Sequence, residues 1–180
     1  MPLPPGMNAL GPDRGTLEVR TYREGVGQAV GHDLIIDVTG WQANAEVSGE
    51  GALIALGLEV DPRSLRVREG LRGVKPLTDK DRTKIRQEID GKVLHGQPIE
   101  FRSTAVKSSH GGLRVDGQLT IAGTSRPASF ELELADDRLS GVLPVTQTEF
   151  GIKPYRGFMG ALKVRDTVEL AVDVRLPSSG

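Results

Sequence analysis

The most constraining feature of this sequence is a run in which apolar and polar residues alternate and which is interrupted once. The run covers residues 117–134, and a Gly-Thr-Ser-Arg-Pro break stands at 123–127. The apolar residues at every second position are Leu119, Ile121, Phe130, Leu132 and Leu134. A period of two over this length indicates two β-strands of a sheet that has one dry and one wet face.

The same period recurs along most of the chain. Strands are predicted over residues 16–22, 32–39, 41–48, 52–60, 64–69, 99–107, 113–122, 128–135, 138–148 and 168–176. Short turns rich in Gly, Asp and Pro separate them, which is typical of a meandering antiparallel sheet. The connections leave room for a single helix, so a parallel sheet of βαβ units is excluded. Alternation alone fits a closed barrel and a sandwich equally well.

Residues 79–90 break the two-residue period. Thr78 followed three residues later by Asp81 is typical of a helix start. Ile85 and Ile89 lie four residues apart, hence on one helical face, and Gly91 suits a left-handed stop. We expect one short helix that packs a narrow isoleucine edge against the sheet.

Length, charge and composition limit the possible classes. A chain of 180 residues fits one domain, and a net charge of −1 without a basic block argues against nucleic-acid binding. The absence of cysteine excludes disulfides, thiolate metal sites and cysteine nucleophiles. Residues 1–15, rich in Pro and Gly, are predicted to be a disordered tail, 16–176 a single domain and 177–180 a second tail.

The first residues have neither the basic region nor the apolar segment of a signal peptide. No apolar run approaches the roughly 18 residues needed to cross a bilayer. These two observations predict a soluble, cytoplasmic protein without a transmembrane segment.

Residues 117–134 resemble the G-x-L-T-I-x-G-x-[ST]-R-P signature of the YceI-like family. Three further blocks at 31–38, 98–106 and 150–153 resemble the early histidine-led strand, the P-x-I-x-F-x-S strand and the late F-G-I turn of that family. The resemblance extends from about Thr16 to Leu176. It implies a bacterial, all-β, lipocalin-like antiparallel barrel of about eight strands with one short helix near 79–90, in a divergent branch that lacks an export signal.

The resemblance also implies a function. The family holds a polyisoprenoid-type lipid in an elongated apolar cavity, so we expect non-catalytic binding, sequestration or transport of a polyisoprenoid or isoprenoid-quinone type of lipid, with no cofactor required. An aromatic content of 4% is compatible with a cavity lined by small aliphatic side chains, but composition alone favours an ordinary aliphatic core. The residues expected to line the cavity are Leu34, Ile36, Ile54, Leu56, Phe101, Leu119, Ile121, Phe130, Leu132, Phe150, Leu170 and Val172.

A second set of residues is expected at the mouth of the barrel, where a lipid head group would lie. The set comprises His32, Arg126, Lys153, Tyr155, Arg156 and Phe158. For two of them a structural role competes with ligand binding. His32, at the start of a strand, can bond a backbone carbonyl, and Arg126 can anchor a turn by donating to carbonyls.

Motifs for catalysis are weak. Residues 25–31 resemble a dinucleotide-binding glycine loop, but a strand follows where that motif requires a helix. His32, His95 and His110 lack metal-ligand spacing, and the serines lack a strand-elbow-helix context. We therefore expect no enzyme, no catalytic residue and no metal.

Two alternatives stay open on the sequence. One is a barrel filled by its own side chains that acts as a stress-related interaction module. The other is a lipocalin-like enzyme that uses His32 with an arginine. The expected partner of the carrier is a hydrophobic small molecule, and a two-fold homodimer is the default for such a barrel.

Overall fold

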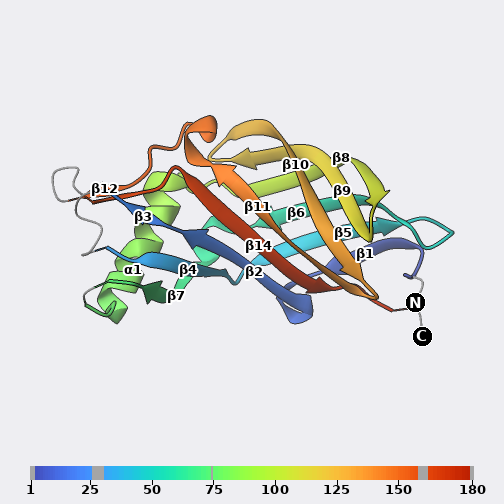
Figure 1. Ribbon diagram of the computed structural model, residues 1–180, viewed down its shortest axis with the longest axis horizontal. Helices are drawn as coiled ribbons and strands as arrows, with labels where there is room; N and C mark the ends of the chain where they lie inside the picture. The colour runs from blue at the N-terminus through green and yellow to red at the C-terminus, as the bar shows by residue number, and fades with distance from the viewer. Residues whose placement is uncertain (1–2, 26–30, 74, 158–161, 179–180) are drawn as a thin grey trace.

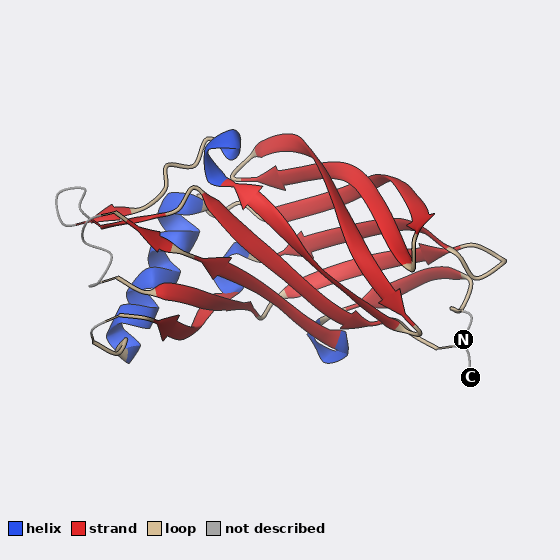
Figure 2. Cartoon of the chain, viewed as in Figure 1, coloured by secondary structure: helices blue, strands red, loops and turns tan. Residues whose placement is uncertain are grey.

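A computed structural model describes residues 3–25, 31–73, 75–157 and 162–178, and it shows a curled antiparallel sheet with one α-helix at one end (Figures 1 and 2). The elements are β1 (Gly6–Leu10), β2 (Gly15–Thr21), β3 (Arg23–Glu24), β4 (Asp33–Val38), β5 (Trp41–Val47), β6 (Leu53–Val60), β7 (Leu65–Leu71), α1 (Asp79–Glu88), β8 (Ile99–Ser109), β9 (Gly112–Ile121), β10 (Thr124–Ala135), β11 (Arg138–Thr146), β12 (Arg156–Gly157), β13 (Leu162–Val164) and β14 (Thr167–Arg175). The all-β, antiparallel prediction with a single short helix is confirmed.

Eleven strands form the main sheet, in the order β1-β5-β6-β8-β9-β10-β11-β14-β2-β4-β7, and β12, β13 and β3 form a small second sheet. The main sheet curls so that β11, β14 and β2 pass in front of β5, β6, β8 and β9, with the core between the two layers (Figure 1). Within the described ranges no pairing joins the edge strands β1 and β7, so the sheet is a half-barrel. The predicted count of about eight strands was too low.

The β9–β10 hairpin contains the alternating tract. Its turn consists of Ala122 and Gly123, both with positive φ (50° and 78°), and Thr124 already pairs with Ile121. Positive φ at both central residues is the signature of the tight hairpin turns that match strand twist. The predicted break at 123–127 was therefore too long. Pro127 is tolerated inside β10 because β11 pairs with β10 only at Glu133–Ala135.

The N-terminal residues differ from their prediction as a disordered tail. β1 pairs with β5 from Gly6 opposite Val47 to Leu10 opposite Ala43, and Leu3 and Leu10 are buried. The free edge of β5 supplies the backbone partners for this strand, and the sheet supplies the apolar cover. Neither is visible in the local composition of residues 1–15.

A β-bulge in β6 also corrects the sequence analysis. Val47 lies opposite Leu53 and Glu46 opposite Ala55, so Ile54 is the extra residue. A bulge reverses the inside-outside parity of the residues on its two sides. Leu53 is therefore buried while Ile54 is 46% exposed, and the prediction that Ile54 lines the interior was wrong.

The helix begins as its capping signal predicts. The backbone N–H of Asp81 donates to Thr78 Oγ1 (3.1 Å), and the backbone N–H of Thr78 donates to Asp81 Oδ2 (2.9 Å). Its end differs, since a π-helical turn at Ile89–Val93 follows and the left-handed residues are His95 and Gly96 rather than Gly91. None of the helices in the described ranges combines the length and the apolar character needed to cross a membrane.

Candidate functional site

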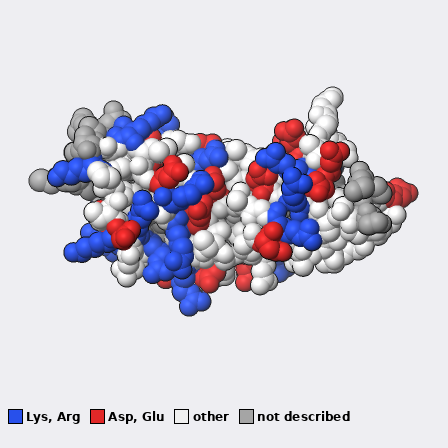
Figure 3. Space-filling view, turned by 90° about the horizontal axis from the view of Figure 1, so that it is seen from below, with Lys and Arg blue, Asp and Glu red and all other residues white. Residues whose placement is uncertain are grey.

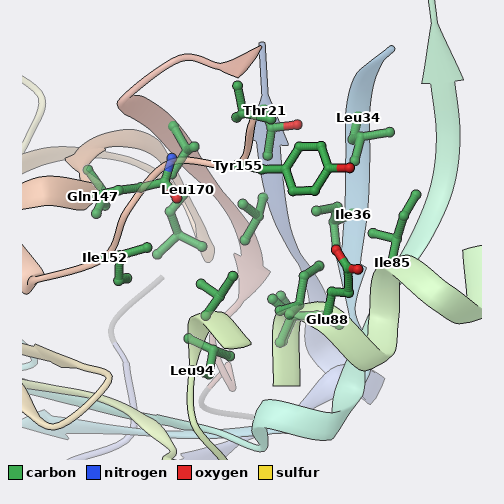
Figure 4. Close-up of a pocket in the computed structure, with 18 of the residues that line it drawn as sticks. Thr21, Leu34, Ile36, Ile85, Glu88, Leu94, Gln147, Ile152, Tyr155 and Leu170 are labelled. Carbon is green, nitrogen blue, oxygen red and sulfur yellow. The ribbon is translucent and has the colours of Figure 1, made fainter. Parts of the chain in front are cut away.

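A cavity of about 520 Å³ lies between α1 and the inner face of the curled sheet. Volumes of roughly 300–1,000 Å³ are typical of small-molecule sites. The alternating residues of β2 and β4 that face inward form one wall. Ile85 and Ile89 of the helical segment also line the cavity, and Figure 4 shows Ile85 on the helix beside it. The isoleucine edge of the helix thus covers a cavity and not a filled core.

A second cavity of about 90 Å³ continues toward the end of the sheet that is distant from α1. Its walls are almost wholly apolar and include the rings of Phe101 and Phe130, whose centroids are 5.3 Å apart in an edge-to-face arrangement. Four leucines line both cavities and separate them; we call them the leucine waist, and they are Leu17, Leu58, Leu119 and Leu170. The two cavities therefore lie end to end across one apolar constriction.

The polar residues that line the larger cavity are both neutral and charged. They are Thr21, Arg23, His32, Asp81, Lys84, Glu88, Gln147, Tyr155, Lys163 and Glu169. Figure 4 shows Thr21, Tyr155 and Gln147 around one side of the cavity and the carboxylate of Glu88 on the side of the helix. The Gln147 amide nitrogen donates to the backbone oxygen of Arg165 (3.0 Å), and Glu88 Oε1 lies 3.5 Å from Lys92 Nζ. Tyr155 is 53% exposed, so its ring lies between the cavity and solvent.

Most of the predicted lining residues reach one cavity or the other. Those at the larger cavity are Leu34, Ile36, Leu119, Ile121 and Leu170. Those at the smaller cavity are Leu56, Phe101, Leu119, Phe130, Leu132, Leu170 and Val172. Two predicted residues line neither cavity: Ile54 is turned outward by the bulge, and Phe150 is buried in the turn Gln147–Phe150.

The six predicted mouth residues have four different outcomes. His32 and Tyr155 line the larger cavity, whereas the exposed Lys153 and Arg156 are not among the described residues around it. Arg126 donates from Nε to the backbone oxygen of Glu149 (2.9 Å), which confirms its turn-anchoring role and places it away from the cavity. Phe158 lies outside the described residues, as do residues 26–30 of the glycine-rich stretch.

His32 is held by the backbone. Its Nε2 atom lies 2.6 Å from the backbone oxygen of Lys75, as the structural interpretation of a strand-start histidine predicted. His95 and His110 are exposed turn residues distant in sequence from it. Within the described ranges, no three His, Asp or Glu side chains are arranged so that they could hold a metal ion.

Charge differs between the two ends of the molecule. Lys and Arg predominate on the visible face at the end that contains α1 and β7, whereas both signs alternate at the opposite end (Figure 3). Close to the large cavity, Lys163 Nζ is paired with Glu24 Oε1 at 3.1 Å. Tyr22, which directly follows β2, donates its hydroxyl to Glu169, and this hydrogen bond raises the pKa of Tyr22.

The sequence analysis missed several lining residues that its own pattern contained. Leu17, Val19 and Thr21 alternate on β2, and Leu58 follows Leu56 on β6, so the period of two could have identified them. Glu88, Gln147 and Ile152 carry no such signal. They reach the cavity because the helix and the turn after β11 both lie against it (Figure 4).

Comparison with known proteins supports this geometry. Residues 92–176 match the family model of the YceI-like domain. The resemblance to the YceI-like family is confirmed. The match covers β8 to β14 and includes the alternating tract, whereas the early block at 31–38 lies outside it. A search of curated protein sequences found no match.

Solved structures extend the likeness beyond the YceI-like segment. BcnA of Burkholderia cenocepacia superposes with a TM-score of 0.60 at 16% identity, over 88% of this chain and 94% of BcnA. The YCEI protein of Campylobacter jejuni superposes with a TM-score of 0.52 at 13% identity, over 78% of this chain and 82% of that protein. At these identities the likeness concerns the fold, and it covers more of the chain than the YceI-like match does.

Proposed function

We propose that this protein binds a long apolar lipid, of the polyisoprenoid or isoprenoid-quinone type, and sequesters or transports it without catalysis. The observation that carries the proposal is the elongated apolar interior, in which cavities of about 520 and 90 Å³ lie on either side of the leucine waist. The YceI-like match supports a hydrophobic ligand as well.

The binding energy would come from desolvation. Each buried methylene contributes about 0.8 kcal/mol, from which the loss of ligand and side-chain freedom must be subtracted. A tail of several isoprene units can offset that loss, whereas a compact apolar molecule cannot contact both cavities. The shape of the interior therefore favours a long ligand over a short one.

A passive carrier agrees with the chemistry of the walls. His32, the residue of the enzyme alternative, is held by a backbone carbonyl, and the described walls bring no nucleophile next to a general base. The two cavities also favour the carrier over a barrel filled by its own side chains. No cofactor is required for this function, and a homodimer and a cytoplasmic location stay predictions.

The proposal is tested by what the protein retains and what it takes up. Organic extraction of the purified protein, followed by mass spectrometry, should release a long-chain lipid in near-stoichiometric amount. After delipidation, a fluorescent polyene probe should bind to the wild type and should bind at least tenfold more weakly to Ile85→Trp, which fills the larger cavity from the helix.

The matched control is Val142→Trp, which adds the same ring at a residue that is 45% exposed. Circular dichroism confirms that both variants are folded. If no lipid is extracted and the delipidated protein takes up no probe, or if folded Ile85→Trp binds the probe as the wild type does, the carrier proposal is wrong.

A further inference from the structure

The end of the molecule that contains β7 and α1 is positively charged, although the whole chain is not. Residues 65–88 contain eight Lys and Arg but only four Asp and Glu, whereas the whole chain has 23 and 24. Figure 3 shows this excess of Lys and Arg on one face of the molecule. Charges more than about 8 Å apart are largely screened at physiological ionic strength. A partner that touches this end therefore experiences its local positive charge and not the net charge of the chain.

Three lysines of this end are available to an external partner. Lys75, Lys80 and Lys84 are exposed, and within the described ranges none of them forms an ion pair. By contrast, Arg68 and Arg72 of β7 are paired with carboxylates of β2 and β4. The three lysines are therefore not needed for the ion pairs that join the strands, and their charge can act outside the molecule.

The acidic groups of the same segment weaken this charge but do not cancel it. The backbone N–H of Thr78 lowers the pKa of Asp81, and Lys84 adds to this effect. Glu69 and Asp79 are exposed carboxylates. Even when all acidic residues are counted, the segment keeps its twofold excess of Lys and Arg.

Two further cations lie beside the entrance of the larger cavity. Tyr155 lines that cavity and is 53% exposed, so the cavity reaches solvent next to its ring. Lys153 and Arg156 are exposed, and neither forms an ion pair with another described residue. Lys84 of α1 also lines the cavity and is exposed. Cations from α1 and from the segment around Tyr155 thus flank the place where the cavity meets solvent.

Exposed apolar groups accompany these cations. Leu71, at the end of the edge strand β7, is 41% exposed, and Tyr155 presents an aromatic ring with a polar hydroxyl. Cations next to apolar and aromatic side chains are typical of surfaces that bind anionic bilayers. Tyrosine in particular favours the interface between head groups and acyl chains. An acidic polymer would match the cations but would offer Leu71 and Tyr155 nothing apolar to contact, so the observations favour a bilayer.

We propose that this basic end, made of the exposed cations named above together with Leu71 and Tyr155, docks on the surface of an anionic lipid bilayer. The entrance of the larger cavity then faces the membrane. The inference goes beyond the carrier function, because docking requires no ligand in the cavity. For a carrier, this orientation lets an apolar lipid pass between bilayer and cavity without full exposure to water.

Sedimentation of the delipidated protein with vesicles tests the docking. The wild type should bind vesicles that contain phosphatidylglycerol about tenfold more tightly than vesicles of phosphatidylcholine alone, and added salt should remove the difference. The triple variant Lys75→Gln, Lys80→Gln and Lys84→Gln should bind the anionic vesicles at least about tenfold more weakly, since each cation near an anionic leaflet strengthens binding about fivefold.

The matched control neutralises three exposed cations that lie outside the basic end and that form no ion pair within the described ranges. It combines Arg14→Gln, Arg102→Gln and Lys107→Gln, and it should bind anionic vesicles nearly as the wild type does. Circular dichroism confirms that both triple variants are folded. Equal binding of the wild type to the two kinds of vesicle, or an equal loss in the two triple variants, would overturn the proposal.

A pair of tryptophan variants distinguishes contact with a bilayer from attraction to any acidic surface. Leu71→Trp should lose fluorescence when the anionic vesicles contain brominated lipid, whereas Val142→Trp, at an exposed position of β11, should not. Trp41 is buried and common to both variants.

Polyglutamate serves as the probe for an acidic protein partner. If the bromine leaves Leu71→Trp unquenched, or if the wild type binds polyglutamate as tightly as anionic vesicles, the bilayer assignment is wrong. The carrier function is judged separately, by uptake of the polyene probe. A protein that binds anionic vesicles but takes up no probe would refute the carrier function and leave this inference standing.

Discussion

The two ends of the curled sheet are built from the same alternating strands, yet they enclose very different spaces. At the end covered by α1, aliphatic side chains together with several polar and charged groups surround about 520 Å³. At the opposite end, Phe101, Phe130 and Trp41 fill the interior and leave about 90 Å³. A strand pattern fixes which residues point inward, but side-chain size and the covering element decide whether the interior is filled.

The largest expected effect tests the packing at the filled end. Phe101 is buried and meets Phe130 edge to face, so Phe101→Ala should lower the free energy of unfolding by about 3–5 kcal/mol. Leu34→Ala, at the wall of the large cavity, should cost clearly less because its side chain already borders empty space. Urea unfolding followed by circular dichroism measures both. Equal losses would contradict the difference between the two ends.

A second prediction concerns the leucine waist. Leu119 is 3% exposed and lines both cavities, so Leu119→Ala should join them. The variant should gain about tenfold in its preference for a C30 over a C15 isoprenoid hydrocarbon, even though its stability falls by about 2–5 kcal/mol. Fluorescence displacement with the two chain lengths measures the preference. An unchanged ratio in a folded variant would show that the waist does not limit ligand length.

A smaller effect on stability is expected from the capping of α1, the helix beside the larger cavity. Thr78→Ala removes a capping hydrogen bond and should lower the free energy of unfolding by about 1 kcal/mol. Thr83→Ala, at an exposed position within the same helix, is the matched control and should not destabilise the protein. Release of a bound probe should become faster in Thr78→Ala alone. Unchanged release would mean that α1 does not cover the ligand.

The smallest expected effect concerns the stability of the fold at acidic pH. The backbone N–H of Thr78 donates to the Asp81 carboxylate and lowers its pKa. The ionised cap therefore stabilises the fold above the ordinary aspartate pKa of about 3.9, and this contribution is lost as the pH falls toward the lowered value. Asp81→Asn should reduce the loss of stability between about pH 5 and pH 2, as thermal melting across that range would measure. An identical pH profile for wild type and variant would contradict this.

The sequence by itself determined the elements that depend on neighbours along the chain. The two-residue period predicted most strands, and the Thr78–Asp81 pair predicted where the helix begins, because side-chain parity and capping are local properties. The motif at 117–134 also indicated a resemblance to the YceI-like family, and residues 92–176 match the model of the YceI-like domain.

Only the tertiary structure decided what depends on pairing and packing between distant residues. The bulge that turns Ile54 outward arises from the register between β5 and β6, and β1 forms because β5 offers it a free edge. Likewise, α1 lies beside the inner face of the sheet, and a cavity of about 520 Å³ stays between them. Register, edge pairing and empty volume are set by contacts between segments far apart in the chain, so a local pattern of apolar and polar residues does not specify them.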